Sequence, residues 1–156
     1  MVASTTPWRD VSYNLPTRKM PQGAIRSIVY LDAFLPRNGQ SLIDLVGTEN
    51  APPDATQDPV PFPGAGRTGD AHLESLVTPH PFGTLTEKLA LTGARERIPI
   101  RTYVLATGGP QPTPFVSMAE GIAEDPGWRL EKLACGHNTM IDMPDETLQV
   151  LLRARQ

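Results

Sequence analysis

The chain has 156 residues, of which 39% are hydrophobic and 20% charged, with a formal net charge of −3 at pH 7. One domain is the expectation at this length, and the dispersed basic residues argue against a nucleic-acid partner. No run approaches the roughly 20 apolar residues that cross a bilayer, and the N-terminus lacks the basic and apolar regions of a signal peptide. The single cysteine, Cys135, excludes an internal disulfide. Together these features predict a soluble, cytoplasmic protein that acts without nucleic acid or membrane.

Three segments carry the pattern of strands in a parallel sheet. Residues 25–34 and 98–106 are nearly continuous runs of apolar, β-branched and aromatic residues. Such runs are typical of strands that are buried on both faces. Residues 129–134 form a shorter candidate for a third strand.

Two further segments show helical periodicity. Residues 115–125 place Phe115 and Met118 among apolar side chains at three-to-four spacing, which predicts one apolar face. Residues 145–154 have a similar pattern, and Pro144 stands at the first-turn position that proline favours. The order strand, excursion, strand, helix, strand, helix predicts an α/β fold.

The excursion runs from about residue 40 to residue 95 and is rich in proline. The chain has 17 prolines, about twice the average share, and many fall between Pro52 and Pro81. Weaker helical pieces, SLIDLVG and HLESLV, interrupt this irregular stretch. Several apolar and imidazole side chains in it either line an apolar substrate pocket or pack the excursion against the sheet: Phe62, His72, Leu73, Leu76, His80, Phe82 and Leu85.

Three strands alone make a poor parallel sheet, because such sheets need both faces covered and no open edge. Residues 1–24 show no strand or helix period that could supply the missing parts. We therefore expect the chain to be a piece of a larger fold, and we expect an exposed sheet edge to promote self-association.

Five stretches together resemble the C-terminal half of an α/β-hydrolase. They are VYLDAFLPRNGQSL (29–42), TPHPFGTL (78–85), RTYVLAT (101–107), FVSMAEGIAEDPGW (115–128) and CGHNTMIDMPDETLQVLL (135–152). Their order and spacing are similar to the esterase-like branch that includes pyrethroid hydrolases, plant methyl-ester esterases and hydroxynitrile lyases. The resemblance spans roughly residues 19–155.

This resemblance implies a partial α/β-hydrolase fold, with the last three parallel strands of the sheet, flanking helices and an inserted cap. It divides the chain into an unmatched N-terminal segment, residues 1–24, and the C-terminal part of a hydrolase domain, residues 25–156. The cap-like insertion corresponds to the excursion at about residues 40–95.

His137 and Asp32 are the candidate catalytic residues. His137 lies on the loop between the third strand and the last helix, and it matches the family's Gly-His turn, which carries the catalytic base. An imidazole can take a proton from a serine and return it to a leaving alkoxide. Many family members place the orienting acid just after the strand that corresponds here to residues 98–106. In this chain the segment that follows that strand, ATGGPQPTPF (106–115), contains no carboxylate. Asp32, at the end of the first strand, is the best substitute; the alternative is a structural aspartate bonded to nearby backbone amides.

The nucleophile motif of the family is missing. No Gly-x-Ser-x-Gly pentapeptide, which forms the sharp turn carrying the serine, occurs in the 156 residues. We expect the chain to start just past this turn. The main backbone donor of the oxyanion hole would directly follow the missing serine, so it is expected to be missing as well.

Two classes of function remain open at this point. The first is a carboxylic-ester hydrolase with a Ser-His-Asp mechanism and a small ester-like substrate. The second is a non-catalytic or truncated remnant that acts, if at all, as a binding module. A zinc site made of Cys135, His137, His72 and His80 matches no known ligand spacing, so we expect no metal and no cofactor.

Overall fold

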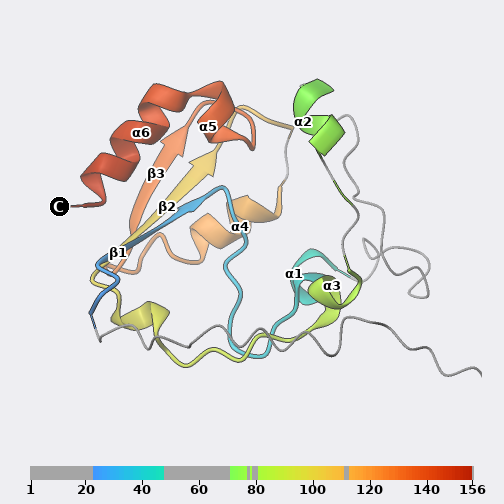
Figure 1. The fold of residues 1–156 in the computed structure, drawn as a ribbon. Helices are drawn as coiled ribbons and strands as arrows, with labels where there is room; N and C mark the ends of the chain where they lie inside the picture. Colours follow the sequence, from blue (N-terminus) through green and yellow to red (C-terminus); the bar gives the residue numbers. More distant parts are fainter. Residues whose placement is uncertain (1–22, 48–70, 77, 79–80, 111–112, 156) are drawn as a thin grey trace, which may run out of the picture.

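Three parallel strands form the centre of the structure, a computed structural model that describes residues 23–47, 71–76, 78, 81–110 and 113–155. The strands are β1 (Ser27–Leu31), β2 (Ile100–Ala106) and β3 (Arg129–Leu133), in the order β1-β2-β3 (Figure 1). Each lies within a segment predicted from the sequence, and both pairings are parallel. The chain therefore has a partial α/β fold.

The two longest predicted helices are also present. α4 (Pro114–Glu120) and α6 (Pro144–Arg153) both begin with a proline, whose missing N–H is not needed in the first helical turn. The remaining helices are short: α1 (Leu42–Val46), α2 (Ala71–Leu76), α3 (Gly83–Thr86), the 3₁₀ turn η2 (Arg95–Arg97) and α5 (Thr139–Asp142). None of the helices in the described ranges is long and apolar enough to span a membrane.

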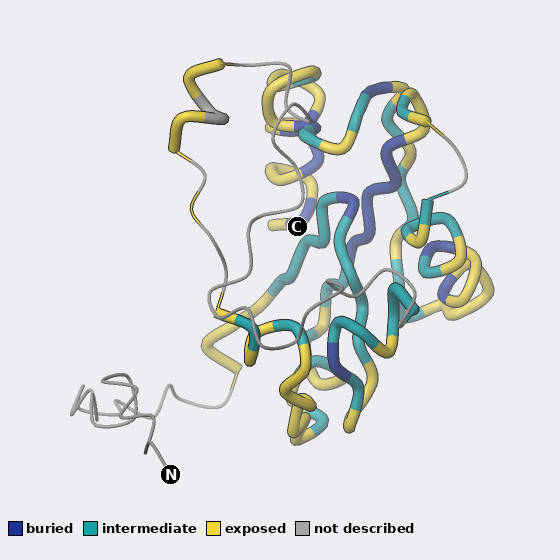
Figure 2. The backbone as a smooth tube through the Cα atoms, turned by 90° about the vertical axis from the view of Figure 1, so that its right-hand side faces the viewer, coloured by how far each residue is buried: buried dark blue, intermediate teal, exposed yellow. Residues whose placement is uncertain are grey.

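The core is built on β2, whose side chains alternate between the two faces of the sheet. Tyr103 and Leu105 are buried against Ala119 and Ile122, from α4 and the turn that follows it. The side chains that alternate with these two, those of Thr102, Val104 and Ala106, point to the opposite face, where α6 lies (Figure 1). Figure 2 shows the buried part of the backbone gathered in the middle of the sheet, with exposed segments around it.

β1 is less buried than its apolar sequence predicts. All five of its residues are half-buried, whereas the last five residues of β2 are buried. The reason is position: β2 has a strand on each side, while β1 pairs only with β2 among the described residues. On its α4 side β1 is covered by aromatic rings, since the Tyr30 ring lies 6.4 Å from Tyr103 and 5.6 Å from Trp128.

The predicted excursion folds partly into short helices beside the sheet. α1 begins with a capping box in which Ser41 and Asp44 bond each other's backbone N–H groups. Backbone hydrogen bonds between Gln40 and Leu89, and between Gly39 and Leu89, tie its two ends together. Residues 48–70, which hold much of the proline-rich stretch, and residues 1–22 lie outside the described residues. The division into 1–24, 25–156 and a cap at about 40–95 therefore stays a prediction.

Candidate active site

The two candidate catalytic residues meet at the carboxyl edge of the sheet. Asp32 follows β1 directly, and His137 follows β3 after a short turn. The carboxyl ends of parallel strands lie at one edge, which brings these distant residues together. His137 Nδ1 lies 2.8 Å from Asp32 Oδ2. The aspartate side chain is only 4% exposed while that of the histidine is 61% exposed, so the pair has a buried acid and an open imidazole.

Asp32 is held in one orientation by β2. Its backbone N–H donates to the Val104 carbonyl at 2.7 Å, and its Oδ1 accepts the Ala106 N–H at 3.0 Å. Its φ of +44° is the one positive value among the described non-glycine residues, and backbone of this kind is strained and concentrated at functional sites. One carboxylate oxygen thus bonds a backbone amide, as the structural alternative expects, and the other faces the imidazole. The catalytic role of Asp32 stays a prediction.

Tyr103 supports the loop that carries the aspartate. Its hydroxyl donates a 2.7 Å hydrogen bond to the Ala33 carbonyl. Burial, and then the negative charge of Asp32, raise the pKa of Tyr103 far above its ordinary value. The phenol thus stays protonated and keeps the residue after Asp32 in place.

The turn before His137 packs closely against the loop after β2. The Gly108 N–H donates to the Cys135 carbonyl at 2.8 Å. A Cβ at Gly108 would lie 2.9 to 3.0 Å from backbone atoms of Ala134 and Cys135, closer than van der Waals contact allows. Gly136 is similarly enclosed, because its N–H donates to Asp142 Oδ2 at 2.8 Å. These two glycines let the loops approach each other and fix where the histidine emerges.

Aromatic side chains flank the imidazole. The Phe115 ring, from the first turn of α4, lies parallel to the His137 ring with 5.1 Å between centroids and 10° between planes. Phe34 packs in turn on Phe115, at 5.0 Å and 58°. His137 is thus held by Asp32 at Nδ1 and by Phe115 on one ring face. Its Nε2 has no hydrogen-bond partner within the described ranges, so this nitrogen is available to a reacting group.

Cys135 is the nucleophilic side chain nearest to His137 in sequence, and its surroundings argue against that role. It is a buried free thiol. Burial raises its pKa, and the charges of Asp142, Asp32 and Glu146 raise it further. A thiol must ionise to attack, so Cys135 is better described as a core residue.

The hydroxyl groups of three described serines are hydrogen-bonded to groups other than His137. The Ser41 hydroxyl donates to Asp44, that of Ser75 to the His72 carbonyl and that of Ser117 to the Pro114 carbonyl. Ser27 opens β1, at the opposite end of the strand from Asp32. No described serine hydroxyl is hydrogen-bonded to His137.

The structure groups no three metal-ligating side chains in the described part of the chain. Of the four zinc ligands considered from the sequence, Cys135 is buried, His137 contacts Asp32, and His80 lies outside the described residues.

The sequence did not indicate a role in the site for two residues, Phe115 and Asp142. From the sequence, Phe115 is expected on the apolar face of a helix, and Asp142 is expected near the start of the last helix, where an acidic residue suits the helix dipole. In the structure Phe115 stacks on the imidazole and Asp142 binds the backbone of the turn that carries it. Neither contact has a sequence signal, because both partners are brought close only by the packing of the loops.

The arrangement is a buried carboxylate, an imidazole oriented by it and an open Nε2, which together form a proton-accepting site at a sheet edge. Comparison with known proteins finds a curated relative that is an esterase. The chain is 32% identical over 146 residues to the carbendazim hydrolyzing esterase of Nocardioides sp. (strain SG-4G). The alignment covers 81% of this chain and 60% of that esterase, so the chain spans about three fifths of its relative's length. No protein-family profile and no solved structure matches the chain significantly.

Proposed function

We propose that this chain carries the base and the orienting acid of a carboxylic-ester hydrolase of the α/β-hydrolase type. The observation that carries the proposal is the 2.8 Å pair of His137 Nδ1 and the buried Asp32 carboxylate. The similarity to an esterase supports the same class of reaction. The substrate would be a small ester-like molecule.

In this mechanism His137 Nε2 takes the proton of a serine hydroxyl as the serine oxygen attacks the ester carbonyl. The tetrahedral oxyanion collapses to an acyl-enzyme, and the alcohol leaves with the proton that Nε2 returns. Water then attacks the acyl-enzyme by the same route and releases the carboxylic acid. Asp32 accepts a hydrogen bond from the Nδ1–H and stabilises the imidazolium.

The serine is proposed to come from sequence outside these 156 residues, because the chain itself contains no Gly-x-Ser-x-Gly. The DNA upstream of the coding sequence offers a direct test. A Gly-x-Ser-x-Gly codon run there supports the proposal, and its absence in every frame contradicts it.

A hydrolysis assay provides the functional test. The chain alone is expected to give no turnover of a short-chain p-nitrophenyl ester. A fusion that adds the portion of the Nocardioides esterase outside the alignment is expected to hydrolyse it. In that fusion His137→Ala should remove activity, and Asp32→Asn should lower kcat by roughly 10³- to 10⁴-fold because the imidazole loses its orienting partner.

Three outcomes count against the proposal. A folded fusion without activity contradicts the esterase assignment, and a fusion that retains activity after His137→Ala contradicts the role of the histidine. Turnover by the chain alone, abolished by His137→Ala, places the nucleophile inside the 156 residues. Leu148→Ala is a suitable matched control, because this half-exposed residue lies on α6 away from the site.

A further inference from the structure

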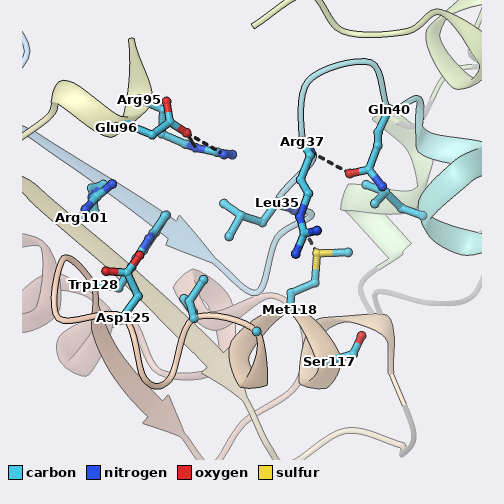
Figure 3. Close-up of a pocket in the computed structure, with 13 residues that line it drawn as sticks. Leu35, Arg37, Gln40, Arg95, Glu96, Arg101, Ser117, Met118, Asp125 and Trp128 are labelled. Atoms are coloured by element: carbon cyan, nitrogen blue, oxygen red, sulfur yellow. Dashed lines mark hydrogen bonds and ion pairs between the residues drawn. The ribbon is translucent and has the colours of Figure 1, made fainter. Parts of the chain in front are cut away.

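A cavity lies on the α4 side of the sheet, apart from the candidate active site. It has a volume of about 360 Å³ and lies between the loop after β1, η2 and the turn after α4 (Figure 3). Asp32, His137 and Phe115 do not line it. We call it the arginine pocket, because Arg37, Arg95 and Arg101 contribute to its wall from three different segments of the chain.

The wall of the arginine pocket also carries apolar side chains. Leu35, Met118, Ile122 and the ring of Trp128 line it. Leu35, Met118 and Trp128 are partly buried against the core that Tyr103 and Leu105 form. Small-molecule sites typically combine apolar side chains with a few polar groups and have volumes of this size.

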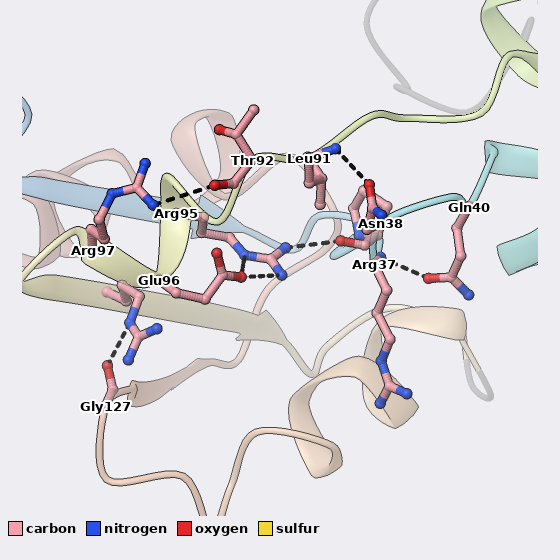
Figure 4. Close-up of polar contacts among 11 residues, drawn as sticks. Arg37, Asn38, Gln40, Leu91, Thr92, Arg95, Glu96, Arg97 and Gly127 are labelled. Atoms are coloured by element: carbon pink, nitrogen blue, oxygen red, sulfur yellow. Dashed lines mark hydrogen bonds and ion pairs between the residues drawn. The ribbon is translucent and has the colours of Figure 1, made fainter.

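Both carboxylates of the pocket are already bound within the protein. Glu96 accepts two hydrogen bonds from Arg95, at 3.0 and 2.9 Å (Figure 4). Asp125 accepts the Gly127 N–H at 2.7 Å. The pKa of the Glu96 carboxyl lies below its ordinary value of 4.5, because the residue's own backbone N–H and then Arg95 stabilise the carboxylate. Arg95 also donates to the Pro36 carbonyl at 2.9 Å. This arginine is therefore a fixed part of the wall.

The other two arginines have donors to spare. Arg101 uses Nε to bind the Gly127 carbonyl at 3.0 Å, and its guanidinium lies over the Trp128 ring at 5.4 Å. Its terminal nitrogens, and the whole guanidinium of Arg37, have no hydrogen-bond acceptor among the described side chains and backbone groups. The two arginines line the pocket on either side of Leu35 (Figure 3).

We propose that the arginine pocket binds a small organic monoanion, a carboxylate attached to an apolar or aryl body. The spare terminal nitrogens of Arg101 would bind the carboxylate, since a guanidinium matches two carboxylate oxygens at once. Arg37, on the other side of Leu35, would add positive charge to the same pocket. The body would lie on Leu35, Met118 and Trp128. Three arginines against two carboxylates leave one net positive charge in the wall, which suits a monoanion better than a dianion such as a phosphate monoester.

Binding of 3-phenylpropionate to the chain tests the proposal without any hydrolysis assay, so its outcome is independent of the proposed function. The probe is titrated while the indole N–H of Trp128 is followed by NMR, with Trp8→Phe used to assign that signal. The expected dissociation constant is about 1 mM or tighter. The neutral 3-phenylpropanamide, of the same shape, is expected to bind roughly tenfold more weakly because charge-assisted hydrogen bonds are lost.

Arginine variants locate the site. Arg101→Gln and Arg37→Gln should each weaken binding of the carboxylate by roughly three- to tenfold. Arg37 is exposed, so its variant keeps the test valid if Arg101→Gln lowers stability. Arg97→Gln is the matched control: Arg97 is on η2 but donates to the Thr92 carbonyl and does not line the pocket (Figure 4). It should leave the affinity unchanged.

Several results would overturn this assignment. They are equal affinity for the amide and the carboxylate, tighter binding of phenyl phosphate than of phenylpropionate, and a loss of affinity in Arg97→Gln equal to that in Arg101→Gln. The absence of any Trp128 shift at 20-fold the expected dissociation constant, roughly 20 mM, would do the same.

Discussion

At the scale of single residues, the site depends on how the His137 ring is oriented. Its Nδ1 faces a carboxylate that is 4% exposed and that β2 holds by the Ala106 N–H. A carboxylate at that position selects the tautomer with the proton on Nδ1, which leaves Nε2 as the acceptor. The Phe115 ring, parallel to the imidazole at 5.1 Å, restricts rotation of the ring away from Asp32.

We therefore predict that Phe115→Leu loosens the His137 ring. Stacked aromatic pairs contribute about 0.5–1.5 kcal/mol beyond area burial, so the share of neutral imidazole with the proton on Nε2 should rise by roughly two- to tenfold. The ¹⁵N chemical shifts of the two ring nitrogens at mildly alkaline pH measure this ratio. A structural role in the core alone would not change the tautomer.

Phe34→Leu is the matched control for that experiment. Phe34 packs on Phe115 at 5.0 Å, and the imidazole stacks on Phe115. This variant removes a similar apolar area and should leave the tautomer ratio close to that of the unmodified chain. An unchanged ratio in Phe115→Leu, or an equal change in both variants, would count against the positioning role.

At the scale of elements, the loops that follow β2 and β3 determine where the histidine lies. The loop after β2 approaches the turn before His137 so closely that Gly108 has no room for a side chain. Its neighbour Gly109 is less confined, since the nearest atom to a Cβ there would be 3.9 Å away. Two adjacent glycines thus have different roles that a sequence pattern cannot separate.

We predict that Gly108→Ala destabilises the fold by about 1–3 kcal/mol, because the new Cβ would press on backbone rather than on a movable side chain. Gly109→Ala should change the free energy of unfolding by less than about 0.5 kcal/mol. Thermal denaturation followed by circular dichroism compares the two. Equal melting temperatures for these variants would show that the loops can separate without cost.

At the scale of the whole molecule, the sheet has two outer strands with different characters. β1 has the sequence SIVYL, and β3 has RLEKL. Apolar, uncharged edges invite pairing with another chain, whereas charged edges resist it. The outer edge of β1 has no strand partner in the described part of the chain, so self-association is expected to use β1.

The register shows which residue to change. Arg26 and Asp32 use their backbone groups to bond β2, and backbone groups alternate in direction along a parallel strand. The Val29 N–H therefore points to the outer edge. We predict that Val29→Pro removes this donor and lowers the weight-average mass in sedimentation equilibrium at high protein concentration.

Lys132→Pro is the corresponding control on β3. Leu133 accepts from Thr107 on the β2 side, so the Lys132 N–H points outward in the same way. This variant should leave the mass distribution as it is in the parent chain, with circular dichroism used to compare the folds. A larger effect of Lys132→Pro than of Val29→Pro would place the association at β3 and contradict the prediction that it uses β1.

Much of the local structure could be predicted from the sequence because it depends on neighbouring residues. Apolar, β-branched runs identified β1 and β2, and residues 129–134 were a shorter candidate that matches β3. First-turn prolines and periodic apolar residues identified α4 and α6. Residues 25–34 were expected to be buried on both faces, which was wrong for β1. Burial depends on how many neighbours a strand has, and that number is a property of the sheet.

The site could be predicted only in part, for a similar reason. Motif order pointed to Asp32 and His137 as candidates, and their catalytic roles remain predictions. The 105-residue separation between them is closed by parallel pairing of three strands, which places both at one edge of the sheet. The sequence by itself determined the elements and the residue types available for chemistry. Only the tertiary structure decided the partners of each side chain, such as Phe115 on the imidazole and Asp142 on the Gly136 amide, because these contacts arise from packing between segments with no common local pattern.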